Sequence, residues 1–513
     1  MILSIISLAL VSSTFTFISA TYYTKRKFKA NSTSTTSLEK TMKELESNKY
    51  PAKAHNLKVK RNLLGKKEKL DVAHTALFIS GGQVESIKYC DQTKPFRQNR
   101  YFFYLSGVNV PGASILFNFN TEKLTLFLPD IDYDDVMWSG MPLSAQDALE
   151  KFDVDEVLYA ERINSSLNDL SHYTIYTTDV DNINDPHLSE LLKPSDPNFF
   201  YALDEARLTK DWYEIELLRE AARITDNCHL SVMSALPIEK NEGHMHAEFT
   251  YHAIRQGSKF QGYDPICCSG TNCGTLHYVK NDEPMDKRQS VLIDAGAEWE
   301  NYTADVTRCF PLSGKFTKEH REIYEAVLDM QSVVMEKIAP GVHWDELHLL
   351  AHRVLIRQFL KLGIFKEEYS ENEIFERKAS LCFFPHGLGH LLGLDTHDVG
   401  GYPNYNDPDP LLKFLRLRRP LEKNMVVTNE PGIYFNPFLI KEYLEKHPER
   451  TEVVDREVMK KYLYVGGVRI EDDILVTDDG YENLTKITSD PDEIERIVSA
   501  SLSKGRSHFH AIV

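Results

Sequence analysis

Apolar positions follow one pattern in the first part of the chain. Short apolar runs bounded by turn-forming residues predict strands at 74–82, 114–120 and 123–130. The last two flank the polar tip at 120–122, so we expect them to pair as a hairpin. Strands then alternate with helical stretches to about residue 190, which is the pattern of an α/β domain. The proline-bearing segment 192–200 predicts the boundary of that domain.

Longer helical patterns dominate the rest of the chain. Residues 210–236 form an amphipathic pattern in which Ile215, Leu218 and Ala222 keep helical spacing. Two further helices are predicted at 318–338 and 344–362. Strand-like apolar runs lie between and after them, at 290–294, 308–312, 425–431 and 465–476. This mixture predicts a second domain of the α+β class.

The predicted organisation therefore has four parts. They are a hydrophobic segment at 1–24, a polar linker at 25–65, an α/β amino-terminal domain at 66–195 and an α+β domain at 205–495. The chain of 513 residues is long enough for each domain to bury its own core.

The first 24 residues carry no charge, and Lys25, Arg26 and Lys27 follow them. About 20 apolar residues can span a bilayer, but Ser and Thr interrupt this segment. Basic residues after the apolar stretch favour a weak membrane anchor with the rest of the chain facing the cytosol. A cleaved or buried segment is the alternative.

Net charge and cysteine content exclude other classes. The net charge of −17 argues against nucleic acid as a partner, because phosphate binding needs a basic surface. The seven cysteines are scattered and form no pair of CxxC motifs, so neither a disulfide framework nor a structural zinc site is predicted. A reducing compartment fits this pattern.

Two aspartates enclose the stretch DAGAEWENYTAD, from Asp294 to Asp305. A hairpin centred between Trp299 and Glu300 would place them directly opposite, with Cβ atoms ~5 Å apart. Two carboxylates at that distance repel each other, and a divalent cation would remove the conflict. Trp-Glu is, however, a poor hairpin turn. The alternative is a pair of solvated residues at strand ends.

Other potential ligands end or interrupt apolar strands in the same way. Glu430 ends the run MVVTNE, Glu471 lies in GGVRIEDD, and His390 closes HGLGH. Four carboxylates and one imidazole balance two divalent cations, and hard or borderline ions such as manganese suit this set. Two metals ~3.5–4 Å apart can activate water and polarise a carbonyl, which is a hydrolase design.

The motif HGLGH has a simpler alternative interpretation. His386 and His390 have helical spacing, but Gly387 and Gly389 make a regular helix doubtful. No glutamate follows His386, so this is not the HExxH zinc motif. A hydrogen-bonding histidine pair in a loop is the alternative.

Taken together, these motifs resemble the Xaa-Pro metallopeptidases, prolidase and aminopeptidase P, whose catalytic domain has the pita-bread fold. The resemblance rests on DAG with ADVTR, PHGLGHLLGLDTHDVGG, TNEPGIYF and GGVRIEDD, and more weakly on FRQNRYFFYLSG. It covers about residues 71–484. It implies that two divalent metal ions are bound by Asp294, Asp305, His390, Glu430 and Glu471.

The resemblance also implies roles for individual residues. Asp305 and Glu471 would bridge the metals, and Glu430 would handle the proton of a metal-bridging hydroxide that attacks the Xaa-Pro bond. Catalytic roles are implied for His277, His386 and His397, substrate binding for Arg416 and Tyr263, and a supporting role around the metals for Tyr263, Thr307 and Arg469. The chain departs from the usual family pattern at Asn429, where an apolar residue precedes the glutamate.

Three functions remain open from the sequence. An aminopeptidase P cleaves the N-terminal Xaa-Pro bond of longer peptides, whereas a prolidase is restricted to Xaa-Pro dipeptides. A non-catalytic binding module on the same fold is the third. The resemblance further implies a homodimer, and Trp138 lies where a residue that closes the partner's site would be expected; a simple surface tryptophan is the alternative.

Overall fold

The structure is a computed structural model that describes residues 43–45, 47–180 and 186–504. The predicted hydrophobic segment at 1–24 lies outside these residues. Over the described ranges, no helix is both long and apolar enough to cross a membrane. From Tyr50 onward the chain forms one compact unit. None of the seven cysteines forms a disulfide.

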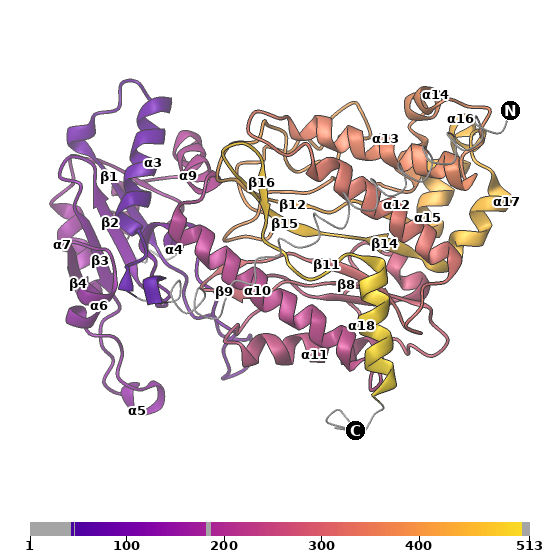
Figure 1. Cartoon of the computed structure of the whole chain (residues 1–513). Coiled ribbons are helices and arrows are strands. Elements are labelled where there is room, and N and C mark those ends of the chain that lie inside the picture. Colours follow the sequence, from indigo (N-terminus) through magenta and orange to yellow (C-terminus); the bar gives the residue numbers. More distant parts are fainter. Residues whose placement is uncertain (1–42, 46, 181–185, 505–513) are drawn as a thin grey trace, which may run out of the picture. The chain divides into compact units, whose positions relative to one another are not determined.

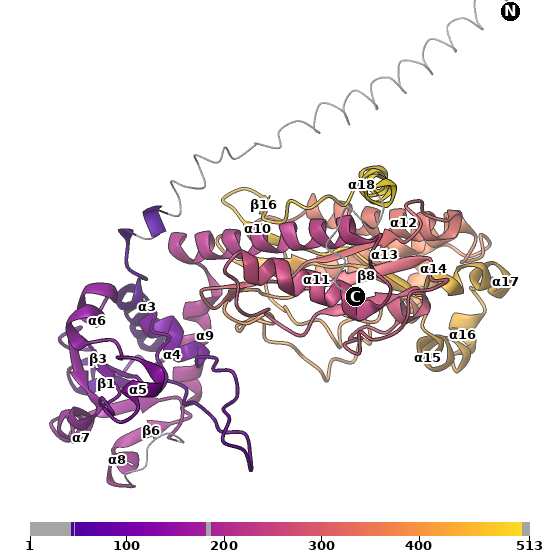
Figure 2. The same ribbon diagram turned by 90° about the horizontal axis from the view of Figure 1, so that it is seen from below.

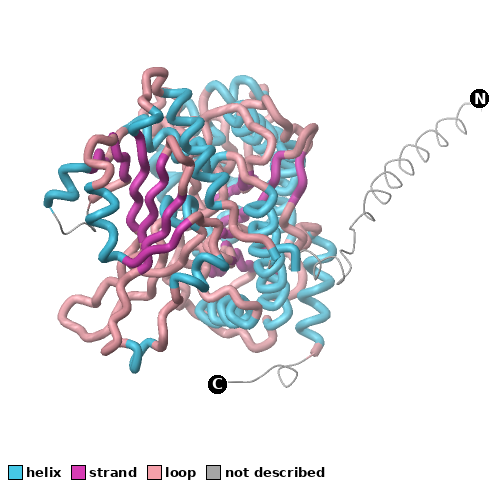
Figure 3. The backbone as a smooth tube through the Cα atoms, turned by 90° about the vertical axis from the view of Figure 1, so that its left-hand side faces the viewer, coloured by secondary structure: helices cyan, strands magenta, loops and turns pink. Residues whose placement is uncertain are grey.

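A six-stranded mixed sheet is built from the first part of the chain, with the order β4-β3-β2-β1-β5-β6 (Figures 1 and 3). Strands β2 and β3 pair antiparallel, as the hairpin prediction requires. Strand β1 pairs antiparallel with β2 but parallel with β5. The strands are β1 (Thr75–Ser80), β2 (Ser114–Asn118), β3 (Leu124–Leu128), β4 (Glu156–Tyr159), β5 (Thr174–Thr177) and β6 (Leu192–Pro194).

The segment predicted as a boundary, 192–200, is regular structure. Residues 192–194 form the edge strand β6, and helix α9 (Pro197–Leu208) follows. Proline is tolerated at both places, because an edge strand and the first helical turn each leave an N–H unused. The shorter helices around this sheet are α4 (Arg100–Ser106), α5 (Val136–Ser139), α6 (Ala145–Lys151), α7 (Ile163–Asn168) and α8 (Pro186–Leu191).

Helix α3 (Ala52–Lys66) occupies the last third of the segment for which the sequence predicts a polar linker with some helix. It packs against α9 and α4, and Val59 and Leu63 are fully buried. Polar residues also face inward: Asn56 donates hydrogen bonds to the carbonyl oxygens of Ala52 and Leu105, at 2.9 and 2.7 Å. The helix looks polar in sequence because part of its buried face is held by hydrogen bonds rather than by apolar contact.

The predicted long helices are confirmed. Helix α10 (Trp212–Ala235) begins with a capping box and packs against α11 (Glu242–Arg255) and α18 (Pro491–Ser503). Helix α12 (Lys318–Met335) packs against α13 (Trp344–Leu362). The pairs α10–α11 and α12–α13 can be followed in Figures 1 and 2.

Small antiparallel sheets lie against these helices. One has the order β11-β8-β7 and another β12-β15-β16, and β13 pairs with β14 and β9 with β10. The strands are β7 (Ile266–Ser269), β8 (Ser290–Asp294), β9 (Glu298–Trp299), β10 (Tyr302–Thr303), β11 (Thr307–Pro311), β12 (Val426–Asn429), β13 (Gly432–Tyr434), β14 (Gly467–Arg469), β15 (Asp472–Val476) and β16 (Tyr481–Asn483). Four short helices complete this part: α14 (Glu371–Glu376), α15 (Pro437–Leu439), α16 (Pro448–Thr451) and α17 (Arg456–Met459).

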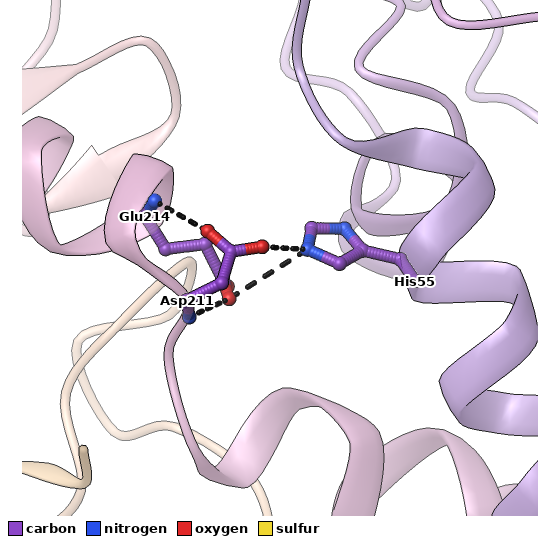
Figure 4. Close-up of side chains that lie close together, drawn as sticks. All are labelled: His55, Asp211 and Glu214. Carbon is purple, nitrogen blue, oxygen red and sulfur yellow. Dashed lines mark hydrogen bonds and ion pairs between the residues drawn. The ribbon is translucent and has the colours of Figure 1, made fainter.

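A hydrogen-bonded joint connects α3 to the start of α10 (Figure 4). The Nδ1 atom of His55 donates to the Tyr104 carbonyl at 2.7 Å, and its Nε2 lies 2.9 Å from Asp211 Oδ2. The Glu214 carboxylate lies 3.7 Å from Nε2 and accepts from the hydroxyl of Tyr302 on β10. The geometry of the three side chains could suit a cation, but these atoms already bond protein groups, so we interpret the cluster as structural.

Candidate metallopeptidase active site

One cavity of about 860 Å³ collects the predicted site residues. Eleven of them line it: Tyr263, His277, Asp294, Asp305, His386, His390, His397, Arg416, Glu430, Arg469 and Glu471. Thr307 lies directly behind, where its hydroxyl donates to Glu471 Oε2 at 2.6 Å. The structure therefore brings together residues from seven separate stretches of sequence.

The hairpin that carries the two aspartates differs in register from the prediction. Asp294 pairs with Thr307, not with Asp305, and Trp299 pairs with Tyr302. The turn is thus formed by Glu300 and Asn301, both with positive φ, instead of by Trp299 and Glu300. Two such residues give the backbone twist that tight hairpins favour. The centre of the hairpin therefore lies one residue later in the sequence than predicted. The prediction that Asp294 and Asp305 are directly opposite is wrong.

The two aspartates nevertheless meet at one hydroxyl group. Tyr263 Oη contacts Oδ1 of Asp294, and lies 2.5 Å from Oδ1 of Asp305. A phenol has one proton, so it cannot donate to both carboxylates at once. A cation between the aspartates would relieve this conflict. The arrangement is therefore compatible with a metal-binding role for the two aspartates.

His390 and Glu430 are placed by a loop that lies against β12. The N–H of Thr428 donates to the His390 carbonyl and that of Glu430 to the Leu388 carbonyl, each at 2.9 Å. A side chain at Gly389 would collide with the Thr428 carbonyl, so only glycine permits this approach. The segment is irregular, as the two glycines predict.

The imidazole of His390 has the orientation of a metal ligand. Its Nδ1 donates to the Leu391 carbonyl at 2.9 Å, which leaves Nε2 as the acceptor. That Nε2 atom lies 3.3 Å from Asp305 Oδ2 and 3.6 Å from Glu430 Oε1. Burial lowers the pKa of His390 to about 4, so the ring is neutral and its lone pair is available.

Glu471 and Asp294 are held by a network behind the cavity. Arg469 donates to Asp294 Oδ2 at 2.6 Å, to the Thr307 hydroxyl at 3.1 Å and to the Tyr434 hydroxyl at 2.9 Å. The Thr307 hydroxyl in turn donates a hydrogen bond to Glu471 Oε2. The bridge between Thr307 and Glu471 fixes the backbone at the same place.

Electrostatics favour cation binding at this site. Burial raises the pKa of Asp294 and raises that of Asp305 to about 6. Burial also raises the pKa of Glu430 and Glu471 well above the usual value, and the two aspartates raise both further. Donor atoms of Asp305, His390 and Glu471 lie within 4.8 Å of one another. This oxygen-rich set with one imidazole fits divalent cations.

The remaining histidines occupy different positions. The His386 Nε2 atom lies 2.8 Å from the Tyr434 hydroxyl, so His386 belongs to the supporting network. The ring of His397 is 4.5 Å from that of His390 and is exposed to the cavity. His277 is also exposed there. Exposed imidazoles in a cavity are free to contact a substrate.

Sequence reasoning missed two residues that support the site. Tyr434 connects His386 to Arg469, and Asp473 accepts from the backbone N–H of Asp305 at 3.1 Å. Tyr434 belongs to the quoted motif TNEPGIYF, and Asp473 directly follows RIED. Their motifs could have drawn attention to them, but their contacts arise only from tertiary packing.

Comparison with known proteins agrees with this geometry. Residues 216–478 match the model of metallopeptidase family M24, and residues 58–176 match that of the aminopeptidase P N-terminal domain. An uncharacterized peptidase of Saccharomyces cerevisiae is 64% identical over 92% of this chain and 88% of its own length. A probable Xaa-Pro aminopeptidase of Botryotinia fuckeliana is 44% identical over 88% of this chain and 98% of its own.

Solved structures confirm the fold. Aminopeptidase P from Escherichia coli, in complex with the inhibitor Pro-Leu, superposes with a TM-score of 0.72 at 30% identity. The match covers 89% of this chain and all of that one. The predicted pita-bread fold and the resemblance to the Xaa-Pro metallopeptidases are therefore confirmed, and the prolidase and binding-module alternatives are not favoured. Membership of family M24 implies dependence on divalent metal ions. The chain belongs to metallopeptidase family M24 and is a hydrolase of the Xaa-Pro aminopeptidase type.

Proposed function

We propose that this protein hydrolyses the N-terminal Xaa-Pro bond of peptides. The observation that carries the proposal is the single cavity that unites five potential metal ligands with His277, His397 and Arg416. A bond to proline lacks an N–H, so a peptidase cannot recognise it through that group. A site that holds the carbonyl oxygen and the peptide's ends can still act on it.

Two divalent cations, with manganese as the metal, would be held by Asp294, Asp305, His390, Glu430 and Glu471. Support comes from the shared Tyr263 hydroxyl and from the raised carboxyl pKa values, both of which a pair of cations would offset. When bound, the cations polarise the scissile carbonyl and activate water for attack on it.

The protein's own groups would handle protons and charge. Glu430 would take the proton from the attacking water and deliver it to the proline nitrogen, which must be protonated to leave. His277 and His397 would donate hydrogen bonds to the carbonyl oxygen as negative charge develops there. Arg416 would bind the carboxylate of a short substrate.

The choice between longer peptides and dipeptides is tested with the full chain. We expect the protein, stripped of metal and reloaded with Mn²⁺, to cleave an Xaa-Pro-Xaa tripeptide at least as fast as an Xaa-Pro dipeptide. The reason is that Tyr405, Phe414 and Phe438 line the cavity and are exposed, so the cavity is wide enough for a residue after the proline. Chromatography of the products from both peptides, side by side, measures the two rates.

Other outcomes of this assay point elsewhere. Cleavage of the dipeptide alone would identify a prolidase. No cleavage of either peptide, with metal bound, would favour the binding module. An Xaa-Ala-Xaa tripeptide serves as the control for selectivity toward proline.

We also propose that a second copy of the chain covers the exposed apolar segment around α5. Tyr133, Met137, Trp138 and Met141 are 71%, 77%, 79% and 66% exposed, and large apolar side chains gathered in this way favour an interface. The double variant Met137→Ser, Trp138→Ser is expected to turn a dimer into a monomer in light scattering. Tyr89→Ser, at another exposed aromatic residue, should leave the dimer intact. A wild-type monomer would contradict the proposal.

Two sequence predictions stay predictions. One is membrane attachment through residues 1–24 with the catalytic part facing the cytosol. The other is the division into domains at 66–195 and 205–495.

A further inference from the structure

We propose that Gln331, on helix α12, is a positioning residue that sets the spacing of Glu430 and Glu471 and so the affinity of the metal site. Gln331 is 3% exposed. Its side-chain amide donates to the carbonyl oxygen of Asn429 at 3.2 Å and to that of Ile470 at 3.4 Å. Each of these carbonyls directly precedes one of the two glutamates.

Each of the two glutamates lies in a gap of two residues between consecutive strands, 430–431 between β12 and β13 and 470–471 between β14 and β15. Strand β12 ends at Asn429 and β14 ends at Arg469. The N–H of Glu430 is held by the Leu388 carbonyl at 2.9 Å, and that of Glu471 by the Thr307 carbonyl at 3.2 Å. Gln331 binds the carbonyl oxygen of each of these same two peptide groups and so joins both to one side-chain amide. It thereby connects two segments whose carboxylates repel each other without a cation.

Asn429 completes the arrangement and explains a departure from the family pattern. Its side-chain amide donates to the backbone carbonyl of Gln331 at 3.1 Å and contacts Met335 Sδ at 3.9 Å. The side chain therefore points to α12, not into the cavity. Its Oδ1 atom is buried without a hydrogen-bond partner, which is unfavourable. An apolar residue would avoid that cost, so we attribute the asparagine to its bond with Gln331.

The inference rests on the proposed metal site, so its test measures binding of Mn²⁺ alone. The full chain, stripped of metal, is titrated with Mn²⁺ by calorimetry. Gln331→Met keeps the side-chain length but cannot donate, and we expect its affinity for Mn²⁺ to be about 10-fold weaker than wild type. The matched control is Val334→Ala, on the same helix and fully buried. It should lose stability but keep the wild-type affinity.

The outcomes separate this inference from the proposed function. A wild-type chain that binds no Mn²⁺ overturns the metal site itself. Wild-type binding with equal affinity in Gln331→Met overturns the positioning role. If Gln331→Met does not fold, Gln331→Asn keeps a buried amide but is one methylene too short to reach both the Asn429 and the Ile470 carbonyl, and an unchanged Mn²⁺ affinity in that variant overturns the positioning role equally.

Discussion

Glu471→Gln is expected to lower hydrolysis of an Xaa-Pro-Xaa tripeptide by about 1000-fold, equivalent to about 4 kcal/mol of barrier. The amide keeps the size of the side chain and can still bond Thr307. It removes one negative charge from a site that we propose holds two cations, so metal content should fall as well. The value of kcat/KM and elemental analysis of the purified variant measure the two effects.

Glu239→Gln is the control for that loss. Glu239 is also a buried carboxyl, 6% exposed, but it does not line the cavity. The control should therefore retain both metal and activity. Normal metal content and normal hydrolysis in Glu471→Gln would be incompatible with the proposed ligand set.

Arg469→Met is expected to destabilise the metal-free protein by about 3–5 kcal/mol. The guanidinium is almost fully buried and is bonded to Asp294, Thr307 and Tyr434. Its loss leaves the buried Asp294 carboxylate without its positive partner. Denaturant unfolding with a chelator present gives the change, and added Mn²⁺ should recover part of it by neutralising the same carboxylate.

A surface arginine provides the comparison. Arg321 pairs with Glu325 and Asp492 at the protein surface, where ion pairs contribute about 0–1 kcal/mol. Arg321→Met should therefore change stability little. If the two variants were destabilised equally, the buried pair would have no special role.

The hydrophobic pattern predicted the long helices and the strands around the site, because amphipathic spacing is a local property. It failed where hydrogen bonds take the place of apolar contact. Helix α3 looks like a linker because His55 and Asn56 on its buried face are polar. Only the partners of these residues, distant in sequence, explain their burial.

The register of the hairpin shows a second limit. The prediction centred the turn so that Asp294 and Asp305 would be opposite. The structure places the turn at Glu300 and Asn301, and glutamate is not a residue that marks positive φ. The proposed ligands were found from sequence motifs. The roles of Tyr434 and Gln331 depend instead on which helices and strands pack together, and the sequence pattern does not predict that packing.

The proposed ligands span the chain from Asp294 to Glu471 and lie on both sides of α12 and α13 in the sequence. A growing chain on the ribosome therefore lacks the last proposed ligand until residue 471 has been synthesised. The complete set of proposed ligands would therefore exist only after residues 294–471 have all been made, so binding of both cations at full affinity would come late in synthesis.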